Sequence, residues 1–400
     1  MFARVLSQGD RYNLRQTLRQ HGHPHPDSVL PAAQDQLVLE LVGVPPEAAA
    51  QFGCWLYHCA FAGWWHEVRD DVNACKRLLI GGTRRQIMNV LERRPDAFSP
   101  DPLVAQLRDA IQSVEQKPSQ LVLGDRRLDL NHRTYIMGIL NVTADSFSDG
   151  GLYLNPQLAV KRAEEMLQEG ADLIDVGGQS SRPGAVPVPE TVERERVVPV
   201  VREIVKRFKA LVSVDTYRSA VAAACLDAGA VLINDISAMR FDPKMAPLIA
   251  DNDASVVLMH MQGTPKTMQQ APHYDQVVDD VYVFLHDRLQ EAIQHGISRQ
   301  KIIVDPGFGF GKTVQHNLAL LKGLATFQAL GQPLLVGTSR KSFLGHLLKR
   351  EVWDRLEGTL SSVIYAISQG AAVVRVHDVG PVVQAVRLAN ALAQPSVAAP

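Results

Sequence analysis

The chain has 400 residues, of which 46% are hydrophobic, so it can bury one large core and has length for a second, smaller domain. Its 41 lysines and arginines nearly balance its 42 aspartates and glutamates, which excludes an overall field that would draw it to nucleic acid or to an anionic membrane. The four cysteines, Cys54, Cys59, Cys75 and Cys225, are irregularly spaced, which argues against a disulfide framework and predicts a reducing compartment, by default the cytoplasm.

The first 118 residues predict a small α/β domain of unknown role. Its expected elements are a strand at 36–42, an apolar helix-like stretch at 45–68, the run CKRLLIGG at 75–82, and helices near 83–94 and 101–116. No stretch predicts a leader peptide or a membrane span. The Pro-containing segment EQKPSQ (115–120) is the expected linker to a second domain at 119–400.

One group of side chains in this first domain has the chemistry to bind zinc: Cys54, Cys59, Cys75, His58 and His66. No CxxC pair is present, and residues 54–65 have the composition of an apolar core helix. A structural helix is therefore the preferred interpretation.

From residue 134 one pattern repeats: a short apolar, β-branched run, a loop of small or polar residues, and an amphipathic stretch of helical period. The eight runs lie at 134–140, 172–177, 211–216, 231–236, 255–260, 301–306, 333–339 and 373–378. Eight such units predict a (β/α)8 TIM barrel, typically ~250 residues, and fit a doubly wound sheet less well. Before them, LVLGDRRLDL (121–130) alternates around Gly124 and Asp125 as a hairpin does, and we expect it to close the bottom of the barrel.

Polar side chains gather at the carboxyl ends of the predicted strands, where barrel enzymes build their active sites. They are Asn141, Asp215, Asn234, Asp235, Asp305, Ser339, Arg340, His377 and Asp378. Helix capping and turn formation account for individual Asp and Asn residues at such places. They do not account for Lys341, Arg375 and His377 in the same layer.

Three of the loops have an unusual composition: MGILNVTADSFSDGG (137–151), GGQSSRPGA (177–185) and DPGFGFGK (305–312). The last lacks the GxxxxGK[ST] spacing of a phosphate-binding loop for ATP. Together with VSVDT, INDI, LMHMQGTPKTM, GTSRKSFLG and RVHD, these stretches resemble dihydropteroate synthases, in that family's order across residues 120–395. The chain differs from the usual family pattern at Ala144, Gln179 and Ser181, where Pro, Glu and Thr are common.

The resemblance implies an enzyme that joins a dihydropterin pyrophosphate to 4-aminobenzoate and releases pyrophosphate. A pterin presents N–H donors beside a carbonyl, so its pocket needs buried acceptors, an amide and a cation. By resemblance, Asp305 and Asn234 bind the pyrimidine edge, Asp215 the reduced pyrazine ring and Lys341 the carbonyl side, with Met259 packed nearby. Taken alone, Asp305 could be a helix cap and Lys341 a solvated charge.

The leaving diphosphate is expected to bind Asn141, Arg375 and His377, with Mg²⁺ held by Asn141, phosphate oxygens and waters. These three residues, with Asp215, Asp305 and Lys341, form the predicted catalytic set. No general base is obvious from the sequence. None is needed if the substitution is dissociative, because an arylamine is already nucleophilic and the dihydropterin can delocalise positive charge.

For 4-aminobenzoate, the pocket needs a cation for the carboxylate and apolar walls for the ring. The candidates are Phe147, Ser181, Arg182, Pro183, Phe310 and Ser342. By resemblance, the first two of the three loops close only when pyrophosphate is bound, which would keep water from the cationic intermediate. The resemblance also implies a homodimer formed through barrel helices.

Two other functions fit part of the pattern. A methyltetrahydrofolate:corrinoid methyltransferase shares the acidic and amide pterin contacts but does not need the SRPG and FSDGG loops. A degenerate binding or regulatory protein is disfavoured because the whole polar set, from Asn141 to His377, is intact.

Overall fold

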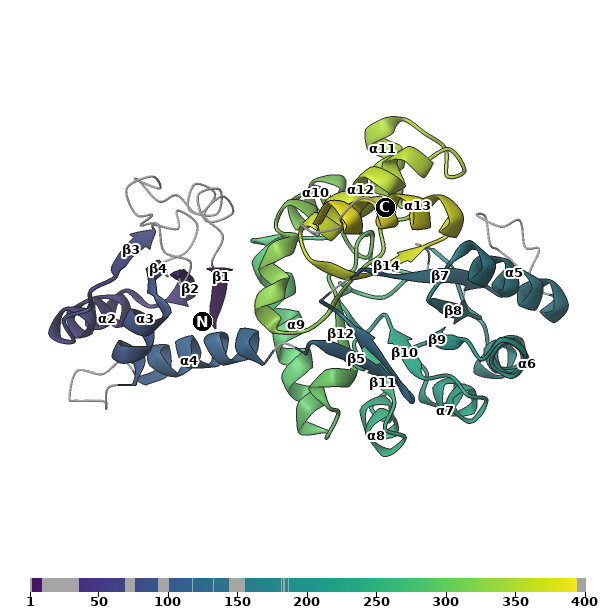
Figure 1. Ribbon diagram of the computed structural model, residues 1–400, viewed down its shortest axis with the longest axis horizontal. Helices are drawn as coiled ribbons and strands as arrows, with labels where there is room; N and C mark the ends of the chain where they lie inside the picture. Colours follow the sequence, from purple (N-terminus) through teal and green to yellow (C-terminus); the bar gives the residue numbers. More distant parts are fainter. Residues whose placement is uncertain are drawn as a thin grey trace, which may run out of the picture. The chain divides into compact units, whose positions relative to one another are not determined.

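The computed structural model describes residues 2–8, 36–68, 76–92, 101–116, 118–131, 133–143, 155–180, 182, 184–185 and 187–393. The chain forms two compact units (Figure 1): Met1–Lys117 together with Ala329–Gly331, and Pro118–Gln328 together with Gln332–Pro400. No helix within the described ranges has both the length and the apolar character needed to cross a membrane.

The first unit is an antiparallel sheet covered by helices. Its strands are β1 (Phe2–Gln8), β2 (Gln36–Val44), β3 (Trp64–Val68) and β4 (Lys76–Thr83), in the order β1-β2-β4-β3. Its helices are α2 (Pro46–His58), α3 (Arg84–Leu91) and α4 (Asp101–Glu115). Buried side chains of sheet and helices form one core, including Leu39, Phe52, Trp55, Leu78, Ile87 and Leu107. A small α/β domain is therefore confirmed.

The long helix expected at 45–68 was wrong in its second half. The helix ends at His58, and Trp64–Val68 forms a strand paired with β4, Trp65 opposite Ile80. The chain reverses where Ala60 takes a left-handed conformation (φ 49°). A Cβ on Gly81 would lie 2.1 Å from the Trp64 ring, so Trp64 packs directly on the glycine backbone. Aromatic packing on a pleated surface therefore outweighed the continuous apolar composition.

The structure describes four of the five zinc candidates. Cys54 is exposed, Cys59 is buried beyond the end of α2, and Cys75 lies outside the described residues. Across the described parts of the chain, no three His, Cys, Asp or Glu side chains come together as a metal site.

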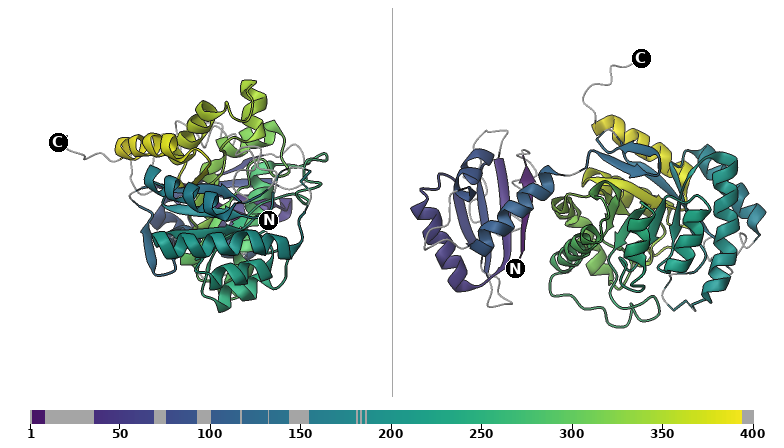
Figure 2. Two further views of the ribbon diagram at one scale, coloured as in Figure 1. Left: turned by 90° about the vertical axis from the view of Figure 1, so that its right-hand side faces the viewer. Right: turned by 90° about the horizontal axis from the view of Figure 1, so that it is seen from below.

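The second unit is a closed barrel of parallel strands, as the repeat predicted. The strands are β7 (Tyr135–Asn141), β8 (Leu173–Gly177), β9 (Leu211–Asp215), β10 (Leu232–Asp235), β11 (Ser255–Met259), β12 (Ile302–Asp305), β13 (Leu334–Val336) and β14 (Ala371–Val376). The surrounding helices are α5 (Pro156–Glu169), α6 (Glu190–Phe208), α7 (Ser219–Asp227), α8 (Met245–Asp251), α9 (Val277–Gln294), α10 (Val314–Lys322), α11 (Ser342–Leu348), α12 (Leu356–Ser368) and α13 (Val379–Ala393). Pairing of β14 with β7 closes the ring, and helices lie on the outside of the strands (Figure 2).

A hairpin closes the amino-terminal end of the barrel, which confirms its predicted place. It consists of β5 (Gln120–Leu123) and β6 (Arg126–Asp129), joined through Gly124 at φ 60°. Leu121 and Leu123 are fully buried against the first inward side chains of the barrel strands, such as Tyr135 and Leu173. Burial of these leucines seals the end opposite the predicted site.

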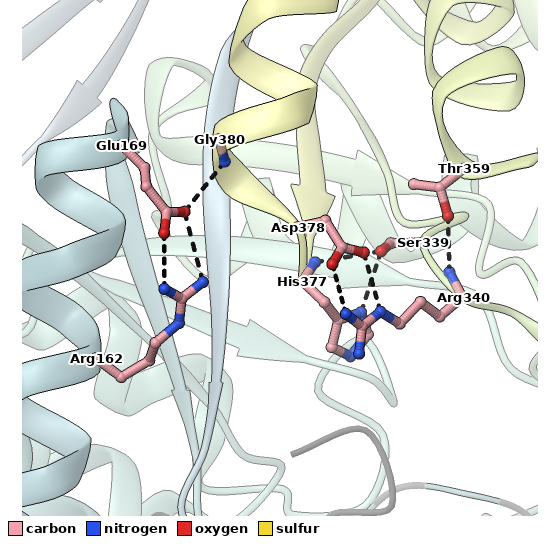
Figure 3. Close-up of polar contacts among 8 residues, drawn as sticks. All are labelled: Arg162, Glu169, Ser339, Arg340, Thr359, His377, Asp378 and Gly380. Carbon is pink, nitrogen blue, oxygen red and sulfur yellow. Dashed lines mark hydrogen bonds and ion pairs between the residues drawn. The ribbon is translucent and has the colours of Figure 1, made fainter. Parts of the chain in front are cut away.

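A polar contact joins the last helix of the barrel to the first (Figure 3). Glu169 at the end of α5 accepts the backbone N–H of Gly380 at 3.1 Å and also binds Arg162 at 2.8 Å. The carboxylate therefore satisfies one of the open N–H groups at the start of α13. Because α13 follows directly on His377 and Asp378, this contact helps to fix the β14 end of the site.

Candidate active site

Four strand ends place their side chains in one layer. Across β7 to β10, Asn141 pairs in register with Gly177, Gly177 with Asp215, and Asp215 with Asn234. A Cβ on Gly177 would lie 3.7 Å from Asn141 Oδ1 and 3.5 Å from Asp215 Cβ, so this glycine lies between the two polar side chains. In a parallel barrel such partners point to the same side of the sheet, here toward the carboxyl-end mouth.

A cavity opens at this end of the barrel. Its lining residues are Asp215, Asn234, Ile236, Met259, Asp305, Phe308, Phe310, Gly337, Lys341 and Arg375. All five residues assigned to the pterin therefore face one cavity. Arg375, which the sequence assigned to the diphosphate, lies in the same wall. The combination of carboxylates, an amide, cations and aromatic walls suits a flat heterocycle with several hydrogen-bonding edges.

Arg375 is held by two carboxylates. Its Nε lies 2.6 Å from Asp175 Oδ2, and its Nη2 lies 2.9 Å from Asp215 Oδ2. Burial raises the pKa of Asp215 to about 7; the Arg375 charge opposes this shift and the neighbouring Asp175 charge adds to it. The guanidinium thus offsets the repulsion between two adjacent buried carboxylates.

Asp175 is a site residue that the sequence analysis missed. Its side chain is fully buried in β8, and the same Oδ2 accepts Asn234 Nδ2 at 3.0 Å. An ionised carboxylate only accepts, so the contact fixes the Asn234 amide with its NH₂ toward Asp175 and its oxygen turned away. The available signal was an aspartate inside a strand that is otherwise apolar.

The next two strands bring a carboxylate and an ammonium to the cavity. Asp305 Oδ1 accepts the Gly307 N–H at 2.7 Å, and burial raises the Asp305 pKa to about 6. Lys341 Nζ lies 4.2 Å from the centre of the Phe310 ring. Burial, and then the Arg375 charge, lower the Lys341 pKa to about 8, while Asp305 and Asp215 oppose this. Both charged forms are therefore available near neutral pH.

His377 is fixed by Ser339 on the adjacent loop (Figure 3). The His377 backbone N–H donates to Ser339 Oγ at 3.2 Å, and His377 Nδ1 lies 3.1 Å from the same oxygen. The Ser339 hydroxyl can donate its proton to Nδ1, and in that arrangement the ring proton lies on Nε2. Burial, and then the Arg340 and Arg375 charges, lower the His377 pKa well below its usual value. His377 is thus a neutral N–H donor.

A bidentate ion pair joins the same two loops. Arg340 donates from Nε and Nη2 to the Asp378 carboxylate at 2.9 and 2.5 Å, and its backbone N–H binds Thr359 Oγ1 at 3.1 Å. Arg340 adopts a left-handed conformation (φ 55°), which is costly for a residue with a Cβ. These contacts hold Arg340 in that conformation and set the path of the backbone into Lys341.

The candidates for 4-aminobenzoate are only partly described. Phe310 lines the cavity, Ser342 begins α11 directly after Lys341, and the Arg182 charge is among those that lower the His377 pKa, after burial and Arg340. Phe147, Ser181 and Pro183 lie outside the described residues, as does Ala144. Gln179, another departure from the family pattern, donates to the Tyr217 hydroxyl at 2.6 Å.

The barrel part of the chain is similar to known proteins. A family model described as pterin binding enzyme matches residues 137–377. The dihydropteroate synthase of Escherichia coli (strain K12) is 47% identical over 264 residues, which cover 66% of this chain and 93% of that protein. The Yersinia pestis dihydropteroate synthase structure with a sulfonamide drug complex gives a TM-score of 0.67 at 44% identity, covering 68% of this chain and 99% of that one. The Xanthomonas albilineans enzyme in complex with 7,8-dihydropteroate gives 0.63 at 40% identity, covering 69% and 100%.

Proposed function

The chain belongs to the dihydropteroate synthase family, and from that premise we propose how its residues make 7,8-dihydropteroate for folate biosynthesis. The reaction condenses (7,8-dihydropterin-6-yl)methyl diphosphate with 4-aminobenzoate and releases diphosphate. The main support for this function is the cavity at the carboxyl end of the barrel, where carboxylates, an amide and an ammonium face aromatic walls. The methyltransferase alternative is not favoured, since the matched relatives are synthases.

In this proposal the pterin enters the cavity edge first. Asp305 and the oxygen of Asn234 accept its pyrimidine N–H groups, Asp215 faces the reduced pyrazine ring, and Lys341 donates to the ring carbonyl. Met259 packs against the ring. Each buried donor then meets an acceptor, which such a site requires because an unpaired buried polar group is costly.

The shifted pKa values predict a window of pH for pterin binding. A carboxyl whose pKa is raised to about 6 is protonated below that pH, so Asp305 loses acceptor capacity there. An ammonium whose pKa is lowered to about 8 loses its proton above that pH, so Lys341 loses its charge there. Asp215, whose pKa burial raises to about 7, is protonated on the same acid side. The affinity for 6-hydroxymethyl-7,8-dihydropterin should therefore peak between about pH 7 and about pH 8 and fall on both sides. Calorimetric titration from about pH 5 to about pH 9 measures this, and a flat profile would remove these groups from the binding edge.

The diphosphate binds beyond the pterin, against His377 Nε2, Arg375 and Asn141. Asp175 and Asp215 engage Nε and Nη2 of Arg375, which leaves its Nη1 as the nitrogen for the leaving group. Mg²⁺ fits a site with one neutral protein oxygen, Asn141 Oδ1, since this ion keeps several waters and binds phosphate oxygens. When bound, it would offset the negative charge that grows on the departing diphosphate.

The 4-aminobenzoate pocket of the proposal lies on the outer side of Phe310. Arg182 and Ser342 bind the carboxylate, and Phe147, Ser181 and Pro183 complete the walls. Sulfonamides carry an aniline and an acidic sulfonyl group, so they should occupy this pocket in competition with 4-aminobenzoate. The arylamine attacks as the neutral nucleophile, and the protein contributes positioning and fixed charge rather than a general base.

A turnover assay tests the function directly. The protein is supplied with 7,8-dihydropterin pyrophosphate, 4-aminobenzoate and Mg²⁺, and diphosphate and dihydropteroate are both measured. Diphosphate release only at the background rate would overturn the function. A parallel series with a chelator in place of Mg²⁺ tests the metal separately, since an unchanged rate would remove Mg²⁺ and leave the synthase intact.

The domain assignment predicts that residues 119–400 are catalytic without residues 1–118. Every assigned residue lies in the barrel unit, which has its own core and its own closing hairpin. A chain of residues 119–400 should therefore fold, and its kcat/KM should stay within about threefold of the full-length value. An inactive but folded barrel would mean that the first domain completes the site.

A homodimer and a cytoplasmic location complete the proposal. Several large exposed apolar side chains lie on neighbouring helices, α11 to α13, and on the loop between the first two: Leu347, Leu348, Trp353, Tyr365, Leu388 and Leu392. Such a patch is typical of a protein interface. Light scattering of the full-length chain measures the mass that a dimer requires.

A further inference from the structure

Lys312 is a buried lysine to which the reaction gives no role. It ends the DPGFGFGK loop, and only 3% of its surface is exposed. Its Nζ lies 2.9 Å from His260 Nδ1, 2.9 Å from the Gly307 oxygen and 3.0 Å from the Phe310 oxygen. The loop therefore folds around its own lysine, and this group of four residues is called the Lys312 clamp.

The clamp is complete in either protonation state of the lysine. As an ammonium, Lys312 donates to both carbonyls and to His260 Nδ1. As a neutral amine, it donates to the two carbonyls, and its lone pair accepts a hydrogen bond from a protonated His260 Nδ1 instead. Burial lowers the Lys312 pKa to about 7, so both states lie within reach at neutral pH. The clamp thus depends on the N–H donors and not on one particular charge.

Two short chains of contacts connect the clamp to residues of the pterin cavity. Gly307, whose carbonyl binds Lys312, uses its N–H to hold Asp305 Oδ1 at 2.7 Å. Phe310, whose carbonyl also binds Lys312, carries the ring under Lys341 Nζ. Between them, a Cβ on Gly309 would lie 3.1 Å from Lys341 Cδ, so the lysine stem crosses the loop backbone closely.

The loop cannot take this path without glycine and a partner for its carbonyls. Gly307 has φ 72°, and a Cβ there would lie 1.9 Å from the His260 oxygen. Gly309 and Gly311 are also left-handed, at φ 79° and 64°. Such turns direct carbonyls inward, where each needs a donor because unpaired buried carbonyls are costly. Lys312 supplies that donor for two of them.

Building on the proposed function, we propose that Lys312 is a positioning residue for pterin binding: its clamp sets Asp305 through Gly307 and Lys341 through Phe310. Lys312 itself does not touch the substrate. Lys312→Met retains the length of the side chain but removes the Lys312 donor from both carbonyls, so that the Gly307 oxygen keeps only the Phe310 N–H at 3.2 Å. Affinity for 6-hydroxymethyl-7,8-dihydropterin should then fall roughly tenfold or more, because a displacement of about 1 Å in a positioned group can cost a hundredfold.

A second buried lysine provides the matched control. Lys301 precedes the same strand, β12, at the opposite end of the barrel, and its Nζ binds the Asp253 backbone oxygen at 2.5 Å. Lys301→Met removes a comparable buried contact far from the cavity. It should lower the melting temperature as Lys312→Met does, but leave pterin affinity within about twofold of the parent protein.

Calorimetry and thermal melting on the full-length chain decide the matter. Lys312→Met with parental pterin affinity would overturn the inference, as would equal losses of affinity in both lysine variants. If Lys312→Met does not fold, Lys312→Leu, which also carries no donor, is judged by the same criterion. If neither folds while Lys301→Met does, Lys312 serves stability alone and the inference fails. A parent protein that binds no pterin would instead contradict the proposed function.

Discussion

Asp305→Asn should nearly abolish pterin binding while leaving the barrel folded. The Gly307 N–H that now donates to Asp305 Oδ1 would hold the new amide by its oxygen. The amide NH₂ would then point into the cavity, where the pterin presents its own N–H groups. Two buried donors facing each other, with the charge removed, cost about 3 kcal/mol or more, which is on the order of a hundredfold in Kd.

A neighbouring aspartate serves as the control for this substitution. Asp235 at the end of β10 is also fully buried, and burial likewise raises its pKa to about 6. Its oxygens accept the N–H groups of Ser237 and Met239 and the Ser237 hydroxyl, all within its own loop. Asp235→Asn should lower the free energy of unfolding by about 1–3 kcal/mol and leave pterin affinity nearly unchanged.

Calorimetry with 6-hydroxymethyl-7,8-dihydropterin compares the two variants. Parental affinity in a folded Asp305→Asn protein would remove this carboxylate from the pterin edge. Equal losses in both variants would mean that the effect comes from disturbing the barrel mouth as a whole.

The barrel could be predicted because each of its strands is marked by residues that are close together in the sequence. Each strand is a short apolar run bounded by turn residues, and all eight predicted runs overlap a strand of the closed barrel. The same kind of local pattern gave one wrong prediction, the helix beyond His58. The apolar composition continues past that residue, but Trp64 packs on Gly81 in an antiparallel sheet. That pairing depends on residues that the local pattern does not include.

A site residue could be predicted from the sequence where a charged or amide side chain follows the carboxyl end of a predicted strand. Asp215, Asn234, Asp305 and Lys341 meet that condition. Asp175 does not, because its role depends on Asn234 and Arg375, which lie 59 and 200 residues away in the chain. Lys312 shows the opposite case, since its lysine after a glycine-rich loop suggests a phosphate contact, whereas its Nζ binds the loop's own carbonyls.

Arg375→Met should cost the protein both stability and turnover. The guanidinium is the cation between Asp175, which is fully buried, and Asp215, which is 12% exposed. Its removal leaves two adjacent carboxylates without their shared partner, and breaking a buried pair in this way costs about 3–5 kcal/mol. The same change removes a donor from the diphosphate, so turnover should fall beyond the loss expected from partial unfolding.

Arg162→Met is the matched control, because Arg162 also binds two carboxylates, Glu165 and Glu169, but on the outside of the barrel. The two glutamates are 45% and 33% exposed, so the loss should be about 1 kcal/mol or less. Urea unfolding measures both variants. Adding Asp175→Asn to Arg375→Met removes one of the stranded charges, and should return part of the lost stability without returning turnover. If the double variant is less stable than Arg375→Met by the full cost of a second substitution, repulsion between the two carboxylates is not what Arg375 relieves.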